Sequence, residues 1–234
     1  MPSEDRSAAD VYDEIAAAYI EDVEGHPYNA HLEFPATTEL IPEVAGKRVL
    51  DAGCGAGLYT EWLLSEGAEV VGVDASKAML AEARTRVEGD VEFHEADLAE
   101  PLPFADNNFD GIVSGLVLDY IEDWKPLFGE FARVLNPGGF VVLSVKHPFD
   151  EFFDGDGENY FAVEGRTKDW DVRDVNIPSY RRPLSAMLNP IIDAGLTIDR
   201  VVEPQPTEAF AEACPERYET ESKQPVFLAV RATR

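Results

Sequence analysis

Three glycines at alternate positions, Gly53, Gly55 and Gly57, directly follow a mostly apolar run at residues 49–52 and precede a helical pattern. Glycine permits sharp backbone turns and leaves room for a ligand against the main chain. The first N–H groups of the following helix are free to donate hydrogen bonds. This spacing predicts a nucleotide-type cofactor site.

Asp51, just before the glycines, narrows the choice of cofactor. A dinucleotide would bring its pyrophosphate to this turn, where a carboxylate repels it, whereas S-adenosylmethionine (SAM) brings an ammonium and a sulfonium. The third position of the dinucleotide fingerprint falls on Leu58, whose side chain would obstruct helix–strand packing. Asp51 could instead cap the turn by accepting nearby backbone N–H groups. The pattern favours SAM over NAD.

Two further acids end predicted strands. Asp74 closes the run at residues 69–74, 21 positions after Gly53, where a carboxylate can accept both ribose hydroxyls and would repel a 2′-phosphate. Asp97 lies near the end of the run at 91–98 and could accept the adenine amino group. An acid after a second strand also occurs in NAD proteins, so neither acid decides the cofactor alone.

Five motifs follow one another along residues 48–146 in the order and spacing of one known family: VLDAGCGAG (49–57), VVGVDAS (70–76), EADL (95–98), FDGIVS (109–114) and RVLNPGG (133–139). The chain thereby resembles the class I SAM-dependent methyltransferases, specifically those that act on small molecules. The resemblance implies an α/β fold: a Rossmann-like, doubly wound sheet of seven strands in the order 3-2-1-4-5-7-6. The last strand is antiparallel, and helices cover both faces. Helical patterns at 8–22, 57–66, 76–87, 124–135 and 183–194 agree, with Ser76 and Asp123 as candidate caps.

The resemblance also implies which residues meet the cofactor. The glycine loop would contact the methionine part, the acids the ribose and adenine, and the N-terminal helix would cover the ligand. Tyr19 shares a helix face with Tyr12, which could equally be a packing face. Cys54 is expected to be a small residue beside the loop rather than a nucleophile. The predicted cofactor residues are Tyr19, Asp51, Gly53, Cys54, Gly55, Asp74, Ala75, Met79, Ala96, Asp97, Leu98 and Ser114.

Methyl transfer depends mainly on aligning acceptor and methyl group, and a general base is needed only when the acceptor loses a proton. His147, after the fifth strand, and Asp119, after the fourth, are the candidate bases. His147 could instead bond backbone at the start of a loop. The histidines have no metal-ligand spacing, so no metal site is expected.

The aromatic-rich segment at 148–182 leaves the fifth strand at the expected cleft and is predicted to form the acceptor site. Rings suit a planar or apolar acceptor and arginines suit a carboxylate, but the same rings could form a satellite core under a loop. The predicted acceptor residues are Tyr160, Trp170, Tyr180 and Arg181.

The 234 residues suffice for one α/β domain. We expect an N-terminal helical cap at 1–45, a SAM-binding core at 46–147, the acceptor insert at 148–182, and a C-terminal part at 183–234 that completes the sheet. The start is acidic and no apolar run approaches a membrane span, so neither a signal peptide nor a membrane contact is expected. Two distant cysteines indicate a reducing compartment, and the cytoplasm is the default.

Charge is the other unusual property: 46 acidic residues against 19 lysines and arginines give a formal net charge of −27. Scattered acids with few lysines are typical of proteins from salt-in halophiles, where molar salt shortens the screening length to about 3 Å. An acidic enzyme from a mesophile could share this composition. Nucleic acid is disfavoured as a partner because no basic patch is present.

The sequence thus predicts a SAM-dependent enzyme that methylates a small molecule, mainly by positioning in a closed cleft, with S-adenosylhomocysteine (SAH) as product. A SAM-binding regulatory or assembly protein without turnover is the alternative, and an NAD-dependent oxidoreductase fits less well. The oligomeric state is not predicted.

Overall fold

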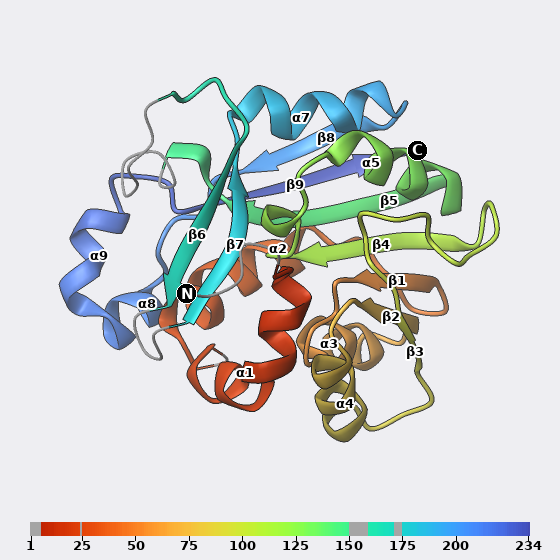
Figure 1. The fold of residues 1–234 in the computed structure, drawn as a ribbon, viewed down its shortest axis with the longest axis horizontal. Helices are drawn as coiled ribbons and strands as arrows, with labels where there is room; N and C mark the ends of the chain where they lie inside the picture. The colour runs from red at the N-terminus through yellow and green to blue at the C-terminus, as the bar shows by residue number, and fades with distance from the viewer. Residues whose placement is uncertain (1–5, 24, 150–158, 171–174) are drawn as a thin grey trace.

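The structure is a computed structural model that describes residues 6–23, 25–149, 159–170 and 175–234; the side chains at 22, 23 and 168–170 lie outside this description. Seven strands form one sheet in the order β3-β2-β1-β4-β5-β9-β8 (Figure 1). These strands are β1 (Arg48–Ala52), β2 (Glu69–Asp74), β3 (Glu92–Glu95), β4 (Phe109–Gly115), β5 (Leu135–Lys146), β8 (Thr197–Val202) and β9 (Phe227–Thr233).

The predicted sheet topology is confirmed. The first five strands pair in parallel, and β9 runs antiparallel to both β5 and β8. The strands predicted as sixth and seventh are β8 and β9, because two additional strands form a separate hairpin. Strand order reverses between β1 and β4, and ligands of open α/β sheets bind at such a reversal.

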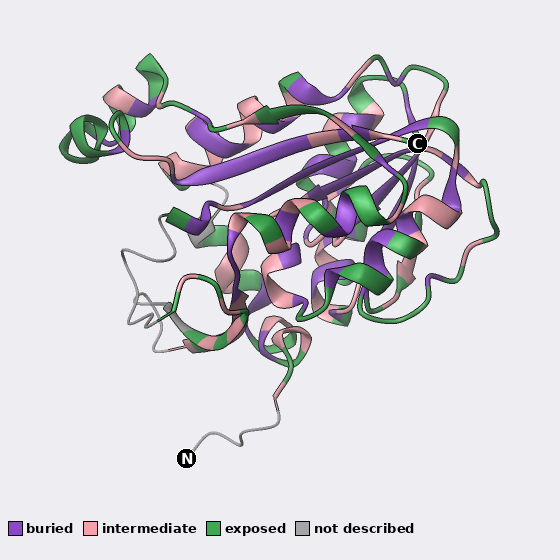
Figure 2. Cartoon of the chain, turned by 90° about the horizontal axis from the view of Figure 1, so that it is seen from above, coloured by how far each residue is buried: buried purple, intermediate pink, exposed green. Residues whose placement is uncertain are grey.

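Side chains that alternate along the central strands belong to two hydrophobic cores, one on each face of the sheet. Leu50 of β1 belongs to the core that contains Phe128 and Phe131, whereas its neighbour Val49 belongs to the core that contains Leu63. Figure 2 shows the buried strands between helices whose outer surfaces are exposed. The helices that cover the sheet are α2 (Phe34–Leu40), α3 (Leu58–Ser65), α4 (Lys77–Arg86), α5 (Trp124–Val134) and α7 (Leu184–Asp193).

Two predicted helix caps are confirmed. The Ser76 side chain accepts the Met79 N–H at the start of α4, and Asp123 accepts the Lys125 N–H at the start of α5. Each satisfies a backbone donor that the helix itself leaves unpaired. The start of α4 is therefore held at the carboxyl end of β2, beside the predicted site.

Several short helices were not predicted. α1 (Ala8–Val23) was expected, but η1 (Asn29–Glu33), η2 (Leu118–Tyr120), α8 (Glu208–Ala213) and α9 (Pro215–Glu221) were not. These helices have too few turns to be stable alone and depend on tertiary packing. Phe210 of α8, for example, is fully buried and packs with Leu32 of η1. No helix in the described ranges has the length and apolar composition needed to cross a membrane.

The segment predicted as an acceptor insert contains a two-stranded antiparallel hairpin, β6 (Glu164–Trp170) and β7 (Val175–Arg181). Figure 1 shows the hairpin standing apart from the main sheet, next to α1. Ile177 of β7 packs with Val11 and Ile15 of α1, and Tyr120 of η2 borders the same cluster. The hairpin thus supports the outer side of α1.

Candidate active site

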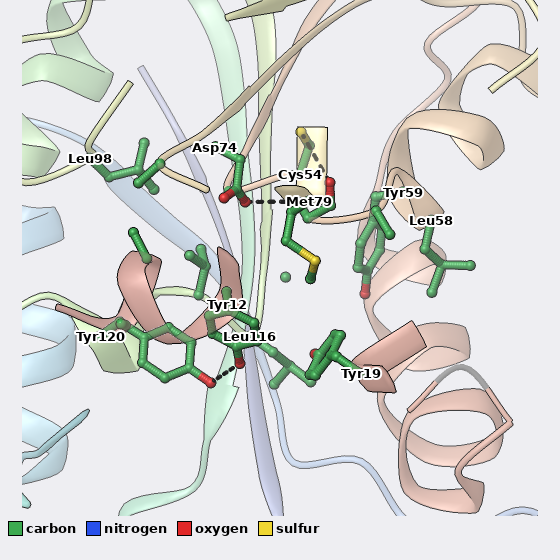
Figure 3. A pocket seen from close by; sticks show the side chains of 18 of the residues that line it. Tyr12, Tyr19, Cys54, Leu58, Tyr59, Asp74, Met79, Leu98, Leu116 and Tyr120 are labelled. Atoms are coloured by element: carbon green, nitrogen blue, oxygen red, sulfur yellow. Dashed lines mark hydrogen bonds between the residues drawn. The ribbon is translucent and has the colours of Figure 1, made fainter. Parts of the chain in front are cut away.

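A cavity of about 230 Å³ lies at the carboxyl ends of β1, β2 and β4. Its floor is formed by the loop after β1, the ends of β2 and β3, and residues 115–117 at the end of β4 and just beyond it. Side chains from α1 and η1 close the opposite side (Figure 3). The position agrees with the reversal of strand order between β1 and β4.

The glycine loop takes backbone conformations that favour glycine. Gly53, Gly55 and Gly57 have φ values of 78°, 52° and 89°. A Cβ on Gly53 would stand 2.5 Å from the Val117 side chain, so glycine is needed there for space as well as for conformation. The N–H groups of Gly53 and Cys54 both donate to Val73 O at 2.8 Å, which ties the loop to β2.

Asp74, at the end of β2, joins the glycine loop to α4. One carboxylate oxygen accepts the Gly55 N–H at 2.9 Å and the other accepts the Ser76 N–H at 2.8 Å. The carboxylate retains acceptor capacity, and the residue lines the cavity. Burial raises the pKa of this carboxyl, against the effect of the backbone N–H donors Ser76, Gly55 and Ala75. Asp74 can therefore accept the paired hydroxyls of a ribose.

The remaining residues predicted for the adenosine end also line the cavity: Ala75, Met79, Ala96, Asp97 and Leu98. Asp97 uses one carboxylate oxygen to accept the Ala99 N–H at 2.8 Å, and its other oxygen is available to a ligand. Cys54 is in the wall as well, and burial raises the pKa of its thiol, which disfavours the reactive thiolate. Their roles toward a ligand stay predictions.

Asp51 and Ser114, which were predicted to bind cofactor, do not line the cavity. Asp51 is 1% exposed and points to the α3 face of β1, where it accepts the Thr60 hydroxyl at 2.5 Å and the Thr60 N–H. Burial raises its pKa to about 7. Ser114 is fully buried and donates to Ala52 O at 2.9 Å. Strand alternation turns both side chains away from the cavity, and the capping alternative describes Asp51 better.

Four tyrosines line the cavity (Figure 3). Three of them form one cluster: Tyr12 and Tyr19 from α1, and Tyr120 from η2. The Tyr12 ring meets the other two edge to face at centroid distances of 5.1 and 5.6 Å. The hydroxyls of Tyr12 and Tyr120 are 2.6 Å apart. Burial raises the pKa of Tyr12 and Tyr19 and raises that of Tyr120 to about 12, so all three stay protonated near neutral pH.

Neither candidate base faces the cavity. His147 lies beyond it: Nε2 is 3.0 Å from Glu203 Oε1, and Nδ1 accepts the Phe149 N–H at 3.1 Å. Asp119 accepts the Lys146 N–H at 3.2 Å. The backbone after β5 continues its pairing toward β9, since the His147 N–H donates to Val226 O at 2.8 Å, and this path carries the imidazole away from the cavity.

The predicted acceptor residues are not in the wall either. Arg181 of β7 pairs with Glu164 of β6, and Tyr160 OH accepts the Leu184 N–H at 3.2 Å. Tyr180 bonds Glu122, and the side chain of Trp170 lies outside the described part. Their role in acceptor binding stays a prediction, and their position does not support it, because the hairpin packs against α1 and its residues do not line the cavity.

Several residues of the wall were not predicted from the motifs, among them Asn29, Glu33 and Tyr120. Tyr120 follows β4 closely, and that position offered a signal. Glu33 belongs to no motif, and its surroundings come from residues distant in sequence. Within the described residues, no group of three or more His, Cys, Asp or Glu side chains is arranged to hold a metal ion.

Comparison with known proteins agrees with the geometry of the site. A family model described as a methyltransferase domain matches residues 50–143. The crystal structure of a SAM-dependent methyltransferase from Mesorhizobium loti is 32% identical and has a TM-score of 0.77, and the match covers 91% of this chain and all of that one. The chain therefore belongs to the family of SAM-dependent methyltransferases.

Two curated relatives match over shorter stretches. A demethylmenaquinone methyltransferase from Clavibacter sepedonicus is 41% identical over 110 residues, 46% of this chain and 44% of the relative. A ubiquinone biosynthesis O-methyltransferase from Alkalilimnicola ehrlichii is 30% identical over 146 residues, 59% of each chain. The chain thus spans about half the length of these relatives. The predicted family, fold and cofactor are confirmed.

Proposed function

We propose that this protein transfers the methyl group of SAM to a small-molecule acceptor and releases SAH. The observation that carries the proposal is the pair formed by Asp74 and the glycine loop in the floor of a cavity that α1 closes. The Asp74 oxygens can accept hydrogen bonds from the ribose hydroxyls. The glycine loop leaves its main chain exposed to the next part of the cofactor. The Asp74 carboxylate would repel the pyrophosphate of a dinucleotide at this position.

When bound, SAM supplies a methyl group on a positively charged sulfur. The chain's own residues then have to hold the acceptor in line with that methyl group and keep water away. The wall suits this task, because its apolar surface comes from Leu116, Val117 and Ile121 and its aromatic surface from the tyrosines of α1 and η2. Among the described residues no histidine lines the wall, which favours catalysis by positioning.

The acceptor that fits this wall is a planar, mostly apolar ring with an oxygen substituent. Aromatic rings suit stacked or edge contacts with such a molecule. The hydroxyls of Tyr12 and Tyr120 stay protonated and can hydrogen-bond the oxygen. Two relatives carry names from menaquinone and ubiquinone chemistry, which supports the same class of acceptor.

We further propose that residues 1–45 act as the cap of the cofactor, residues 46–147 as its binding core, and residues 183–234 as the part that completes the sheet. In this proposal strands β6 and β7 support α1 and do not bind the acceptor.

Calorimetry with SAM, SAH and NAD tests the first step of the proposal. Molar KCl is suitable because the net charge of −27 favours screened conditions. SAM and SAH are expected to bind and NAD is not. Phenols and reduced quinones are then offered with methyl-labelled SAM, and labelled product is sought by mass spectrometry. Tighter binding of NAD than of SAM would contradict the proposal. Binding of SAM without methyl transfer to any acceptor would favour a regulatory protein.

A further inference from the structure

Glu33 is a buried carboxylate in the wall of the cavity. It ends η1, is 3% exposed, and lines the cavity. Three hydroxyls converge on one of its oxygens, Oε1: Thr37 at 3.0 Å, Tyr59 at 2.7 Å, and Ser144. These donors come from α2, α3 and β5. An oxygen that accepts three O–H donors is best suited to carry negative charge.

The second oxygen of Glu33 remains for the cavity. No described residue donates a hydrogen bond to Oε2, and no described lysine, arginine or histidine forms an ion pair with this carboxylate. Burial raises the pKa of Glu33, while the three hydroxyls oppose that effect. A buried charge without a counter-ion is unfavourable because it loses its hydration, so such charges are normally paired. A cationic ligand group in the cavity would supply the missing partner.

Glu221 shows what a paired glutamate looks like in the same molecule. It is also 3% exposed and also accepts a tyrosine hydroxyl, that of Tyr28 at 2.8 Å. Its counter-ion is built in, because a guanidinium nitrogen of Arg217 lies 2.8 Å from the carboxylate. Glu221 does not line the cavity. The two residues therefore differ in two respects: Glu221 has a counter-ion within the protein, and Glu33 faces a cavity where a ligand can bind.

The position of Glu33 indicates which part of the cofactor it meets. Its partner Tyr59 lies in the first turn of α3, directly after the glycine loop. Figure 3 shows Tyr59 on the opposite side of the cavity from Leu98, which belongs to the predicted adenosine end. Asn29, four residues before Glu33 in η1, also lines the cavity. A carboxylate and an amide therefore share the end of the cavity away from the adenine.

We propose that Glu33 and Asn29 form the subsite for the amino-acid end of the cofactor. The Glu33 carboxylate is the counter-ion of the ligand's ammonium group, and the Asn29 amide donates to the ligand's carboxylate. The three hydroxyls hold the Glu33 side chain in place before the ligand arrives, which lowers the entropy lost on binding. This inference rests on the proposed use of SAM and adds the residues that read its charged end.

Glu33→Gln tests the subsite because it keeps the size of the side chain and an oxygen for the three hydroxyls but removes the charge. Dissociation constants are measured by calorimetry for SAM, for SAH, which lacks the sulfonium, and for 5′-methylthioadenosine, which lacks the amino-acid end. We expect SAM and SAH to bind about 10-fold or more weakly, and methylthioadenosine to change by less than about 2-fold. Asn29→Ala should weaken the same two ligands by about 3- to 10-fold.

Glu221→Gln is the matched control and should leave all three affinities within about 2-fold of the parent. Equal weakening of all three ligands by Glu33→Gln would overturn the proposal, because the carboxylate would then only shape the cavity. Weaker binding of SAM alone would overturn the proposal and indicate a contact with the sulfonium instead. Unchanged affinities for all three ligands would also overturn it. If Glu33→Gln does not fold, Asn29→Ala decides by the same criterion. A parent protein that binds none of the ligands contradicts the proposed function and not the subsite.

Discussion

Polar side chains lie at the carboxyl ends of both β2 and β5, but their surroundings differ. Beyond β2, Asp74 and the nearby Asp97 bond backbone N–H groups and still present oxygen atoms to a cavity. Beyond β5, both ring nitrogens of His147 are engaged, by Glu203 and by the Phe149 N–H. The polar atoms of the first region can still bind a ligand. In the second region, which we call saturated, protein groups already occupy both imidazole nitrogens of His147.

The difference follows from the topology of the sheet. Between β1 and β4 the connections leave in opposite directions, so the strand ends diverge and a space remains. After β5 the neighbouring strand is antiparallel, and backbone pairing continues through His147 to Val226. A polar residue at a strand end therefore indicates a ligand site only where the adjacent strands separate.

The largest expected effect concerns Asp51, buried beneath the open region. Its pKa in the folded protein is about 7 against an ordinary 3.8, so the contribution of this carboxyl to stability is full below about pH 4 and is lost as the pH rises through about 7. Asp51→Asn removes this dependence. Relative to the parent, its free energy of unfolding should rise by about 2–4 kcal/mol between pH 4 and pH 8. Urea unfolding at several pH values measures this; a constant difference would refute it.

Asp74→Ala should weaken SAM binding by about 1.5–3 kcal/mol, a factor of about 10 to 100 in the dissociation constant. The change removes the acceptors for the ribose and also releases the Gly55 N–H. Asp123→Ala is the control, since Asp123 likewise bonds a backbone N–H at a helix start but does not line the cavity. It should lower stability and leave SAM affinity unchanged. Equal affinity in a folded Asp74→Ala protein would show that the open region does not bind the ribose.

His147→Ala tests the saturated region. The variant should lose about 1 kcal/mol of stability with the bond from the Phe149 N–H, and its methyl-transfer rate should change by less than about 3-fold. Thermal melts and single-turnover rates measure the two effects. A fall of about 10²–10⁴ in rate with an altered pH profile would instead identify a general base and break the distinction between the two regions.

The smallest expected effect is that of Tyr12→Phe, which removes one of two hydroxyls that are 2.6 Å apart. The free energy of unfolding should fall by about 0.5–1.5 kcal/mol, and the KM for the acceptor should rise a few-fold. SAM affinity should stay constant, because the proposal assigns this hydroxyl to the acceptor. Weaker SAM binding with an unchanged KM for the acceptor would place Tyr12 on the cofactor side.

The sequence by itself determined the sheet and the floor of the site. The motifs from Gly53 to Ser76 are local: each glycine conformation, the cap at Ser76 and the strand end at Asp74 depend on residues close by in the chain or on the adjacent strand. Short-range geometry of this kind leaves a readable pattern of residue types. The strand order and the antiparallel last strand were implied by the resemblance to a known family and not by these local patterns, and the structure confirms them.

Tertiary structure alone decided the upper wall and the surroundings of each polar group. Glu33 meets Ser144 across 111 residues of sequence, and Tyr12 meets Tyr120 across 108. No local pattern records such encounters. His147 and Arg181 had residue types suited to chemistry, but packing supplied them with partners from other elements. A side chain's type and neighbours in sequence limit what it can do, whereas only the folded chain decides whether its polar atoms meet a ligand or another residue.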